Sequence, residues 1–289
     1  MTDHETPAAA AGTVTIGDLT VNRMGFGAMR ITGPGIWGPP ADRDECIRVL
    51  RRAVELGVDF IDTADSYGPK VSEELIAEAL HPYPDGLVIA TKAGLFRPGP
   101  GQWTPNGHPA HLRRAVEGSL ERLRVDRLDV LQLHRPDPRI PFQDTLGALK
   151  ELQAEGRIRH IGLSNVNAKQ LAFARGIVDV VSVQNLYNVA ERRSEAVLAA
   201  CEEAGLPFLP WRPYLGGELS TEAGSPLVAV AERLGATPGQ VVLAWLLHRS
   251  PVMLPIPGTS KVAHLEENVA AADLRLGEED LRAFDALAA

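Results

Sequence analysis

The 289-residue chain contains only two cysteines, Cys46 and Cys201, and both lie in stretches with helical apolar spacing. Neither has neighbours at the spacing of a metal site, so we expect two buried free thiols and a reducing compartment. The opening segment, MTDHETPAAAAGT, lacks the basic and apolar regions of a signal peptide, and no run reaches the ~18 apolar residues of a membrane span. These absences predict a cytoplasmic protein without a membrane partner.

Positive charge and aromatic residues are also scarce. Lysine and arginine number 29 against 37 acidic residues, which gives a net charge of −8, and aromatic residues make up 5% of the chain. This balance argues against a nucleic-acid partner. No G-x-G-x-x-G motif opens a βαβ pattern, which argues against a Rossmann module. Because no linker or low-complexity segment divides the chain, we expect a loose tail at residues 1–12 and one domain over residues 13–289.

The chain does contain a regular alternation of short apolar runs and amphipathic stretches. Runs rich in Val, Ile and Leu predict strands covered by helices, and Gly17-Asp18 predicts the turn of a hairpin. The predicted strands are Thr13–Ile16 and Thr20–Asn22 in the hairpin, then Arg23–Ala28, Val58–Asp62, Leu87–Lys92, Leu128–His134, Ile158–Ser164, Val180–Asn185, Leu206–Trp211 and Val252–Pro255. The predicted helices are Asp44–Leu56, Ser72–Leu80, Pro109–Leu123, Phe142–Glu155, Ala168–Arg175, Ser194–Ala204, Pro226–Leu234 and Pro238–His248. This order predicts an α/β fold, a (β/α)8 TIM barrel with an N-terminal β-hairpin.

Four chemically active side chains occur where predicted strands end. Asp62 and Tyr67 lie in DFIDTADSYG, Lys92 in LVIATKAG and His134 in LDVLQLHRP. The strand ends of a (β/α)8 barrel meet at one mouth. A Tyr near a Lys, with an Asp behind the Lys and a His beside the Tyr, makes a proton donor for a carbonyl oxygen. The Lys charge is expected to lower the Tyr pKa from about 10. Singly, these residues have ordinary structural explanations, so the combination carries the prediction.

Three long loops rich in Gly and Pro follow predicted strands, at Arg30–Ala41, Ala93–His108 and Pro210–Ser225. Loops of this length are usually functional, and in a barrel they would rim the active-site mouth. Trp37 and Trp103 lie in the first two loops without helical or strand periodicity. We therefore predict that both indoles, with Arg30, line a substrate pocket. The alternative is that each indole only fixes its own loop.

A second candidate site follows the last predicted strand, in LPIPGTSKVAHLEENVAA. Gly258, Thr259 and Ser260 form a small turn before a predicted helix, and the free N–H groups of a helix start bind anions. Phosphate sites in barrels often lie near strands seven and eight. Lys261 and His264 add positive charge. The segment therefore predicts a phosphate site for a cofactor.

Together these motifs resemble the aldo-keto reductases over almost the whole chain, most specifically through DTADSYG. The resemblance implies NADPH-dependent reduction of aldehydes and ketones to alcohols, with Tyr67 as the proton donor and Asp62, Lys92 and His134 as the other catalytic residues. It implies a small-molecule carbonyl substrate, no metal, and a monomer or weak homo-oligomer. The phrases GPGIWGPP, VQNLYN and PIPGTSKVAHLEEN are similar to a bacterial branch that includes pyridoxal reductases.

The resemblance also implies the cofactor contacts. Ser164, Asn165 and Gln184 match residues that hold the nicotinamide carboxamide, Trp211 an aromatic that stacks on the nicotinamide, and Asn268 the residue at the adenine edge. The full implied set is Gly27, Ala28, Met29, Ser164, Asn165, Gln184, Trp211, Gly258, Thr259, Ser260, Lys261, His264, Glu267 and Asn268. The segment PWRPYLGG departs from the family pattern because Arg212 and Tyr214 stand at unusual places. His264 stands where the family has a phosphate-binding Arg, and Lys261 is a second candidate for that role.

Two other functions remain open. A non-catalytic NADPH-binding regulatory subunit could share the fold, although the intact set of four residues argues against it. A metal-dependent barrel hydrolase would need several histidines and carboxylates on converging strand ends. His108 and His111 fall in a loop or helix start and His160 begins a strand, so the sequence shows no such cluster.

Overall fold

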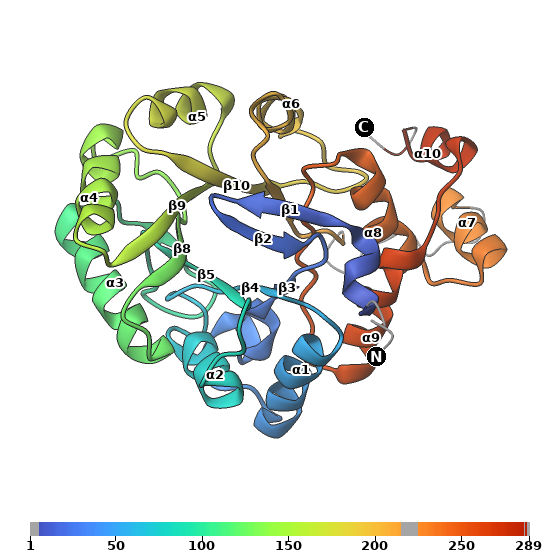
Figure 1. Ribbon diagram of the computed structural model, residues 1–289, viewed down its shortest axis with the longest axis horizontal. Helices are drawn as coiled ribbons and strands as arrows, with labels where there is room; N and C mark the ends of the chain where they lie inside the picture. The colour runs from blue at the N-terminus through green and yellow to red at the C-terminus, as the bar shows by residue number, and fades with distance from the viewer. Residues whose placement is uncertain (1–5, 215–224, 286, 288–289) are drawn as a thin grey trace.

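A curled sheet of parallel strands forms the centre of the protein, and helices cover its outer face (Figure 1). The computed structural model describes residues 6–214, 225–285 and 287, so most of the predicted loop at Pro210–Ser225 lies outside the described residues. The strands are β1 Thr13–Ile16, β2 Leu19–Asn22, β3 Phe26–Gly27, β4 Phe60–Asp62, β5 Val88–Ala93, β6 Leu95–Phe96, β7 Thr104–Pro105, β8 Leu128–Leu133, β9 Ile158–Ser164, β10 Val180–Leu186 and β11 Phe208–Trp211.

Eight α-helices lie close to the eight predicted ranges, because apolar spacing and helix caps mark them clearly in the sequence. They are α1 Arg43–Glu55, α2 Val71–Leu80, α3 Pro109–Leu123, α4 Phe142–Ala154, α5 Ala168–Arg175, α6 Glu195–Ala204, α7 Pro226–Leu234 and α8 Pro238–Arg249. Helix α9 Val262–Ala270 was expected without bounds, and α10 Glu278–Asp285 was not predicted. Asp42 caps α1 through the N–H of Glu45, and Thr237 forms a capping box with Gln240 at α8. Short 3-10 turns lie at Pro7–Ala11, Ala28–Ile31, Pro34–Ile36 and Ala271–Asp273.

Seven parallel strands pair in the order β11-β10-β9-β8-β5-β4-β3. Lys92 on β5 stands opposite Gln132 on β8, and Ser164 on β9 stands opposite Gln184 on β10. Because side chains alternate between the two faces of a strand, this register brings polar residues of neighbouring strands to the inside of the curled sheet. They gather at the carboxyl ends, where the loops of the mouth begin.

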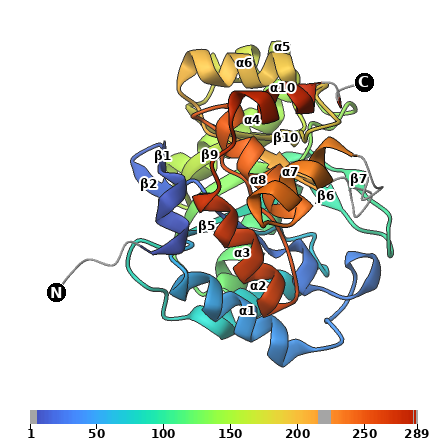
Figure 2. The same ribbon diagram turned by 90° about the vertical axis from the view of Figure 1, so that its right-hand side faces the viewer.

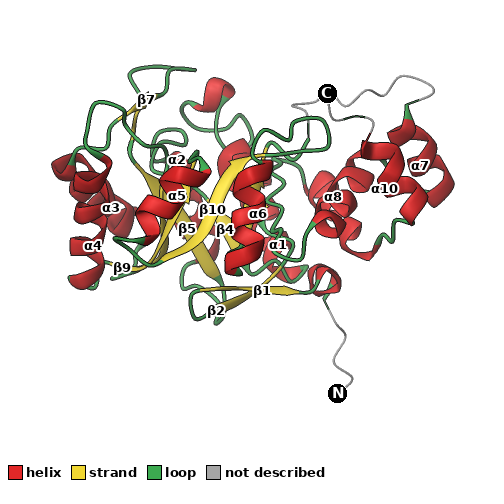
Figure 3. Ribbon diagram, turned by 90° about the horizontal axis from the view of Figure 1, so that it is seen from above, coloured by secondary structure: helices red, strands yellow, loops and turns green. Residues whose placement is uncertain are grey.

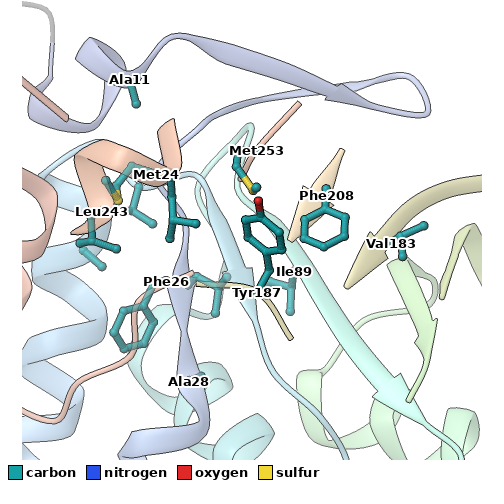
Figure 4. Packing of buried hydrophobic residues seen from close by; sticks show 14 of the residues in the cluster. Ala11, Met24, Phe26, Ala28, Ile89, Val183, Tyr187, Phe208, Leu243 and Met253 are labelled. Atoms are coloured by element: carbon teal, nitrogen blue, oxygen red, sulfur yellow. The ribbon is translucent and has the colours of Figure 1, made fainter. Parts of the chain in front are cut away.

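The predicted eighth strand, Val252–Pro255, is not a regular strand. It makes only an isolated bridge between Met253 and Phe208, whose side chains lie close together in Figure 4. The prediction is wrong because prolines at positions 251, 255 and 257 lack the N–H groups that a ladder needs. The same shortage of donors reduces the first core strand, predicted as Arg23–Ala28, to the two residues of β3.

Residues 252–257, which we call the seam segment, nevertheless connect the two edges of the sheet. On one side, Phe208 donates its N–H to the carbonyl of Val252 at 2.8 Å. On the other side, the N–H groups of Gly25 and Gly27 donate to the carbonyls of Pro255 and Pro257 at 2.9 and 3.2 Å. The sheet is therefore consistent with a (β/α)8 barrel that closes through a proline-rich seam.

The predicted N-terminal hairpin is present as the antiparallel pair β1–β2. It lies across one end of the sheet, opposite the β6–β7 ribbon (Figures 2 and 3). Ile16 and Val21 are fully buried in an inner apolar cluster with Phe60 and Leu209. At the turn, Gly17 has a φ of +65°, and a Cβ there would lie 2.2 Å from the ring of His160. The hairpin thus plugs the end of the barrel away from the mouth.

The loose tail predicted for residues 1–12 is wrong for its second half. Pro7–Ala11 forms a 3-10 turn in which Ala8 and Ala11 are buried, and the N–H of Ala8 donates to the carbonyl of Leu56 at 3.0 Å. Small alanine side chains let this turn pack against the end of α1. Residues 1–5 lie outside the described residues.

A second, larger apolar cluster fills the layer between the sheet and the helices. Tyr187 and Trp245 stack there with ring centres 6.0 Å apart, and Tyr187 meets Phe208 edge-on (Figure 4). Cys46 and Cys201 are buried and unpaired, which confirms the predicted free thiols. In the part of the chain that the structure describes, no helix is both long and apolar enough to cross a membrane.

Candidate active site

The structure brings Asp62, Tyr67 and Lys92 into one hydrogen-bonded chain at the mouth of the sheet. Lys92 Nζ donates to Asp62 Oδ2 at 2.6 Å, to the carbonyl of Thr63 at 2.9 Å and to the hydroxyl oxygen of Tyr67 at 3.3 Å. These contacts use all three ammonium protons. Lys92 is fully buried and Asp62 is 2% exposed, so the ion pair is shielded from water.

His134 completes the predicted group of four. It follows the last residue of β8, and its ring lies 5.9 Å from the ring of Tyr67 at an interplanar angle of 84°. Its Nδ1 lies 3.3 Å from Ser66 Oγ. The four residues come from three adjacent strand ends, β4, β5 and β8, which explains why a chain with wide sequence separations can assemble them.

Burial dominates the electrostatics of this group. Burial raises the pKa of Tyr67, and the nearby Lys92 ammonium lowers it by less, so its net pKa is above the ordinary value. The predicted net lowering is therefore wrong, because the desolvation of a phenolate outweighs one fixed charge. Burial also lowers the pKa of Lys92, but Asp62 and Tyr67 outweigh it and the net pKa is raised. Burial, helped by Lys92, Arg135 and Arg97, holds the pKa of His134 well below its usual range.

These directions fix the protonation states at neutral pH. Tyr67 is a protonated phenol, Lys92 is an ammonium ion and His134 is a neutral imidazole. The arrangement therefore presents a proton donor backed by a buried positive charge, beside a neutral ring that can form hydrogen bonds. This combination can protonate an oxygen atom on which negative charge develops.

A cavity of about 510 Å³ opens above these residues and is lined by Asp62, Tyr67 and His134. Twelve of the residues predicted for the site line it, namely Gly27, Met29, Arg30, Asp62, Tyr67, Trp103, His134, Ser164, Asn165, Gln184, Trp211 and Gly258. Most of its wall is apolar, with polar groups converging at the base, as is usual for a small-molecule site.

Residues 23–289 match the family model described as the Aldo/keto reductase family. The chain belongs to the aldo/keto reductase family. The DTADSYG motif, which carries the earlier resemblance most specifically, supplies Asp62 and Tyr67 to the wall of the cavity.

Two curated proteins and one solved structure illustrate the relationship. The chain is 52% identical over 278 residues to an uncharacterized oxidoreductase of Schizosaccharomyces pombe, which covers 96% of this chain and 90% of that protein. It is 48% identical over 284 residues to the pyridoxine 4-dehydrogenase of Escherichia coli, covering 96% and 99%. An aldo-keto reductase of Klebsiella pneumoniae, solved in complex with NADPH, is 30% identical with a TM-score of 0.81, covering 95% and 94%. This aldo/keto reductase is therefore an oxidoreductase.

Asp62 forms hydrogen bonds with the amide side chains at the polar base of the aldo/keto reductase cavity. Asp62 Oδ1 accepts hydrogen bonds from Gln132 at 2.9 Å and from Gln184 at 2.7 Å. Asn165, in a left-handed conformation with φ 58°, donates to the carbonyl of His134 at 2.9 Å and to Ser164 Oγ at 3.0 Å. Among the described residues, no hydrogen bond occupies the side-chain carbonyl oxygens of Gln184 and Asn165, and both residues line the cavity.

The predicted phosphate segment borders a second cavity, of about 490 Å³, together with Arg30. Thr259, Ser260 and Lys261 line only this second cavity. One N–H of the first turn of α9, that of Val262, donates to Glu45 Oε1 at 3.0 Å. The helix start is therefore partly satisfied by a carboxylate of α1, which the sequence pattern alone did not predict.

Six predicted residues line neither of these two cavities, namely Ala28, Trp37, Lys92, His264, Glu267 and Asn268. Lys92 lies behind Tyr67, and His264 is exposed on α9. Glu267 accepts a hydrogen bond from Thr237 at 2.6 Å, and Asn268 accepts one from the Tyr214 hydroxyl at 2.5 Å. Ala28 is fully buried, and its carbonyl accepts from Ser72. Trp37 packs instead against the guanidinium of Arg97, at 5.5 Å.

Sequence reasoning missed several residues of the site, above all Gln132, Ser66 and Arg97. Gln132 stands two positions before His134, and strand alternation places both on the inner face, so it could have been found from the pattern LDVLQLH. Ser66 lies in the DTADSYG motif, but its contact with His134 depends on the loop conformation. Among the described residues, no three His, Cys, Asp or Glu side chains come together as a metal-binding group.

Proposed function

We propose that this protein reduces aldehydes or ketones to alcohols with NADPH, and that Tyr67 donates the proton. One observation carries the proposal, namely that a buried ammonium, Lys92 Nζ, bridges Asp62 at 2.6 Å and the Tyr67 hydroxyl at 3.3 Å beside the main cavity. A structural ion pair needs no tyrosine hydroxyl directed at a cavity, whereas a proton donor does.

Each residue has a role that follows from its contacts. NADPH supplies the hydride when it is bound. The Tyr67 phenol gives its proton to the carbonyl oxygen, and Lys92 stabilises the phenolate that remains. Gln132 and Gln184 hold Asp62, which in turn holds the Lys92 ammonium. Neutral His134 forms a hydrogen bond with the reacting oxygen and directs it toward Tyr67.

The cavity walls fit a dinucleotide that carries phosphates. Arg30, Arg135 and Arg212 line the main cavity, and no hydrogen bond or ion pair of their side chains occurs among the described residues. The buried indole nitrogen of Trp211 has no hydrogen-bond partner among the described residues either. Cationic groups for the phosphates and amide oxygens of Gln184 and Asn165 for the carboxamide are thus present in one cleft. Lys261 and His264 are the residues that we assign to the 2′-phosphate.

Aromatic aldehydes of moderate size are the substrates that we propose. Trp103 lines the cavity with its ring edge-on to Tyr67, the centres 6.4 Å apart. A flat ring can lie against the indole with its carbonyl toward Tyr67. The name of the Escherichia coli relative, pyridoxine 4-dehydrogenase, makes pyridoxal the first compound to test.

The test is NADPH oxidation by the wild-type protein with pyridoxal, benzaldehyde, propanal and an α-dicarbonyl, beside a Tyr67→Phe variant. We expect turnover that depends on Tyr67, with NADPH binding retained in the variant. NADPH binding without turnover of any carbonyl would contradict the proposal and would favour a regulatory NADPH-binding subunit.

We also propose the wider setting that composition suggests. Residues 13–289 form one domain, and the enzyme acts in the cytoplasm as a monomer or weak homo-oligomer. The two buried, unpaired cysteines support a reducing compartment. Light scattering of the purified protein tests the oligomeric state.

A further inference from the structure

Arg97 is buried in the middle of the loops that rim the cavity. It follows β6 directly and is 7% exposed, although the surrounding loop is rich in Gly and Pro. Its guanidinium donates to the carbonyls of Ser66 at 2.7 Å, Gln102 at 2.8 Å and Gly35 at 3.2 Å. These three carbonyls belong to the loop that carries Tyr67 and to the first two long loops. One side chain therefore ties three segments of the mouth together.

The same guanidinium lies between two indoles. Its central carbon is 3.5 Å from the ring centre of Trp103 and 5.5 Å from that of Trp37. Trp103 in turn lies 6.4 Å from the ring of Tyr67 and 6.3 Å from that of His134. The planar guanidinium can stack and donate at once, a combination that an ammonium group cannot reproduce.

No carboxylate balances the charge of Arg97 among the described residues. A buried cation without an acidic partner is costly, so its place requires compensation from the three carbonyls and the two indole faces. If Arg97 only held the loops in place, its positive charge would not need to lie close to His134. The positive charge of Arg97 is also one of the causes that keep the His134 imidazole neutral.

We propose that Arg97 is a positioning residue that determines substrate choice by holding Trp103 as the wall beside the proton donor. The proposal rests on the proposed function, because it assigns Trp103 to the carbonyl pocket. Arg97 does not touch the reacting atoms. It acts through Trp103 and through Ser66, whose backbone it holds and whose hydroxyl contacts His134. The guanidinium thus sets the position of the indole wall against which a flat aldehyde lies.

The first test is Arg97→Lys, which keeps the charge but can neither span three carbonyls nor stack as a plane. We expect kcat/KM for benzaldehyde to fall about tenfold relative to kcat/KM for propanal, because misplaced walls lose orientation of the larger substrate. The fall should lie mainly in KM, and NADPH affinity should stay within about twofold. Arg97→Met should lower the benzaldehyde-to-propanal ratio of kcat/KM at least as far as Arg97→Lys.

Arg23→Lys is the matched control. Arg23 is half-buried and, like Arg97, donates to several carbonyls, among them those of Met253, Leu247 and Ser250 at 3.0, 2.7 and 2.6 Å, but it lies at the hairpin end of the sheet. Both variants remove a comparable set of bonds and should lower the denaturation midpoint. Only Arg97→Lys should change the benzaldehyde-to-propanal ratio. An equal change of the ratio in Arg23→Lys would overturn the proposal.

A double-mutant cycle tests whether Arg97 acts through Trp103. In a Trp103→Ala background, Arg97→Lys should change the ratio by less than twofold, because the wall it positions is gone. A tenfold change in that background, or no change in the wild-type background, would refute the proposal. The two proposals fail in different ways. If wild-type protein reduces no carbonyl, the proposed function fails, whereas an active enzyme with an unaltered ratio in Arg97→Lys contradicts only the role of Arg97.

Discussion

The ammonium group of Lys92 lies 3.3 Å from the hydroxyl oxygen of Tyr67, and neither side chain is more than 6% exposed. At this separation the ammonium favours the phenolate without removing the proton from the resting phenol, whose pKa is raised by burial. In the proposed mechanism, Tyr67 therefore stays protonated until it reacts, and Lys92 stabilises the phenolate that forms afterwards. The predictions below separate these two effects.

Tyr67→Phe removes the phenol oxygen and keeps the ring. We expect kcat to fall at least ~10²-fold, because a positioned general acid typically contributes that much. The dissociation constant of NADPH, measured by tryptophan fluorescence, should change little. Near-normal kcat in this variant would remove Tyr67 from the acid role.

Lys92→Met leaves Asp62 buried without its cation. Breaking a buried pair in this way costs roughly 3–5 kcal/mol, so the denaturant midpoint should fall clearly. Turnover should fall as strongly as in Tyr67→Phe, because the phenolate loses its charge partner. The double variant Asp62→Asn/Lys92→Met should recover part of the stability but none of the activity. Recovery of turnover in the double variant would show that the ion pair is only structural.

Lys261→Ala and His264→Ala should weaken NADPH more than NADH. Each removes a possible charge-assisted hydrogen bond to a phosphate that NADH lacks, worth roughly 1.5–3 kcal/mol. Lys150→Ala, at an exposed position on α4, is the control and should affect neither cofactor. Dissociation constants from fluorescence titration give the comparison. Equal losses for both cofactors would show that these side chains do not contact the 2′-phosphate.

Asp65→Asn should change how stability depends on pH. Burial, reinforced by the negative charge of Glu73, raises the pKa of Asp65 from 3.8 to about 8, and Oδ1 has no hydrogen-bond partner among the described residues. The folded protein thus holds this proton more tightly than the unfolded chain. Its stabilising effect is present below pH 3.8 and is lost as the pH rises to about 8. Because asparagine does not ionise, the Asp65→Asn variant should not lose stability in this way as the pH rises.

The measurement for Asp65 is the thermal midpoint of wild type and Asp65→Asn across this pH range. We expect the variant to be the more stable protein near pH 8, with the difference disappearing toward pH 4. Asp85→Asn, at an exposed position, should run parallel to wild type. Parallel curves for Asp65→Asn and wild type would contradict the assigned shift.

The sequence predicted the alternation of strands and helices because periodicity and capping are local. The clustering of the four proposed catalytic side chains was predictable for a related reason, since a barrel brings strand ends together. Three of them stand at strand ends, and Tyr67 lies in the loop that follows β4. The irregular seam segment was not predictable. The run VMLPIP is apolar enough for a strand, but its prolines lack the backbone N–H groups that a regular ladder needs. The role of Arg97 was also out of reach, because its partners Ser66, Gln102 and Gly35 depend on three loop conformations that no spacing rule fixes.

The direction of the shift in the Tyr67 pKa could not be predicted from the sequence either. A sequence places a lysine near a tyrosine, but it does not say how much water remains around them. The balance between desolvation and one fixed charge is set by packing, here by Trp103 on one side and His134 on the other. The same reasoning applies to Trp37, whose lack of periodicity indicated a special role but not which side chain it would contact.

The two sides of the mouth, which we call its arcs, differ in how many hydrogen bonds join their strands, and the seam segment lies on the side with fewer. On one arc, β4, β5 and β8 are joined by regular ladders, and the proposed proton donor and its partners lie at their ends. On the other, Gly27 and Gly258 approach so closely that a Cβ on Gly258 would lie 2.4 Å from the carbonyl oxygen of Gly27, and few hydrogen bonds join the strands there. Both glycines line the proposed cofactor cleft. A hinge built into the cofactor side would let a bulky dinucleotide enter and leave at each turnover while the acid stays in register. Amide exchange of Gly25 and Gly27, whose N–H groups donate to the seam segment, should accordingly be faster than exchange within β5 and should slow down when NADPH binds.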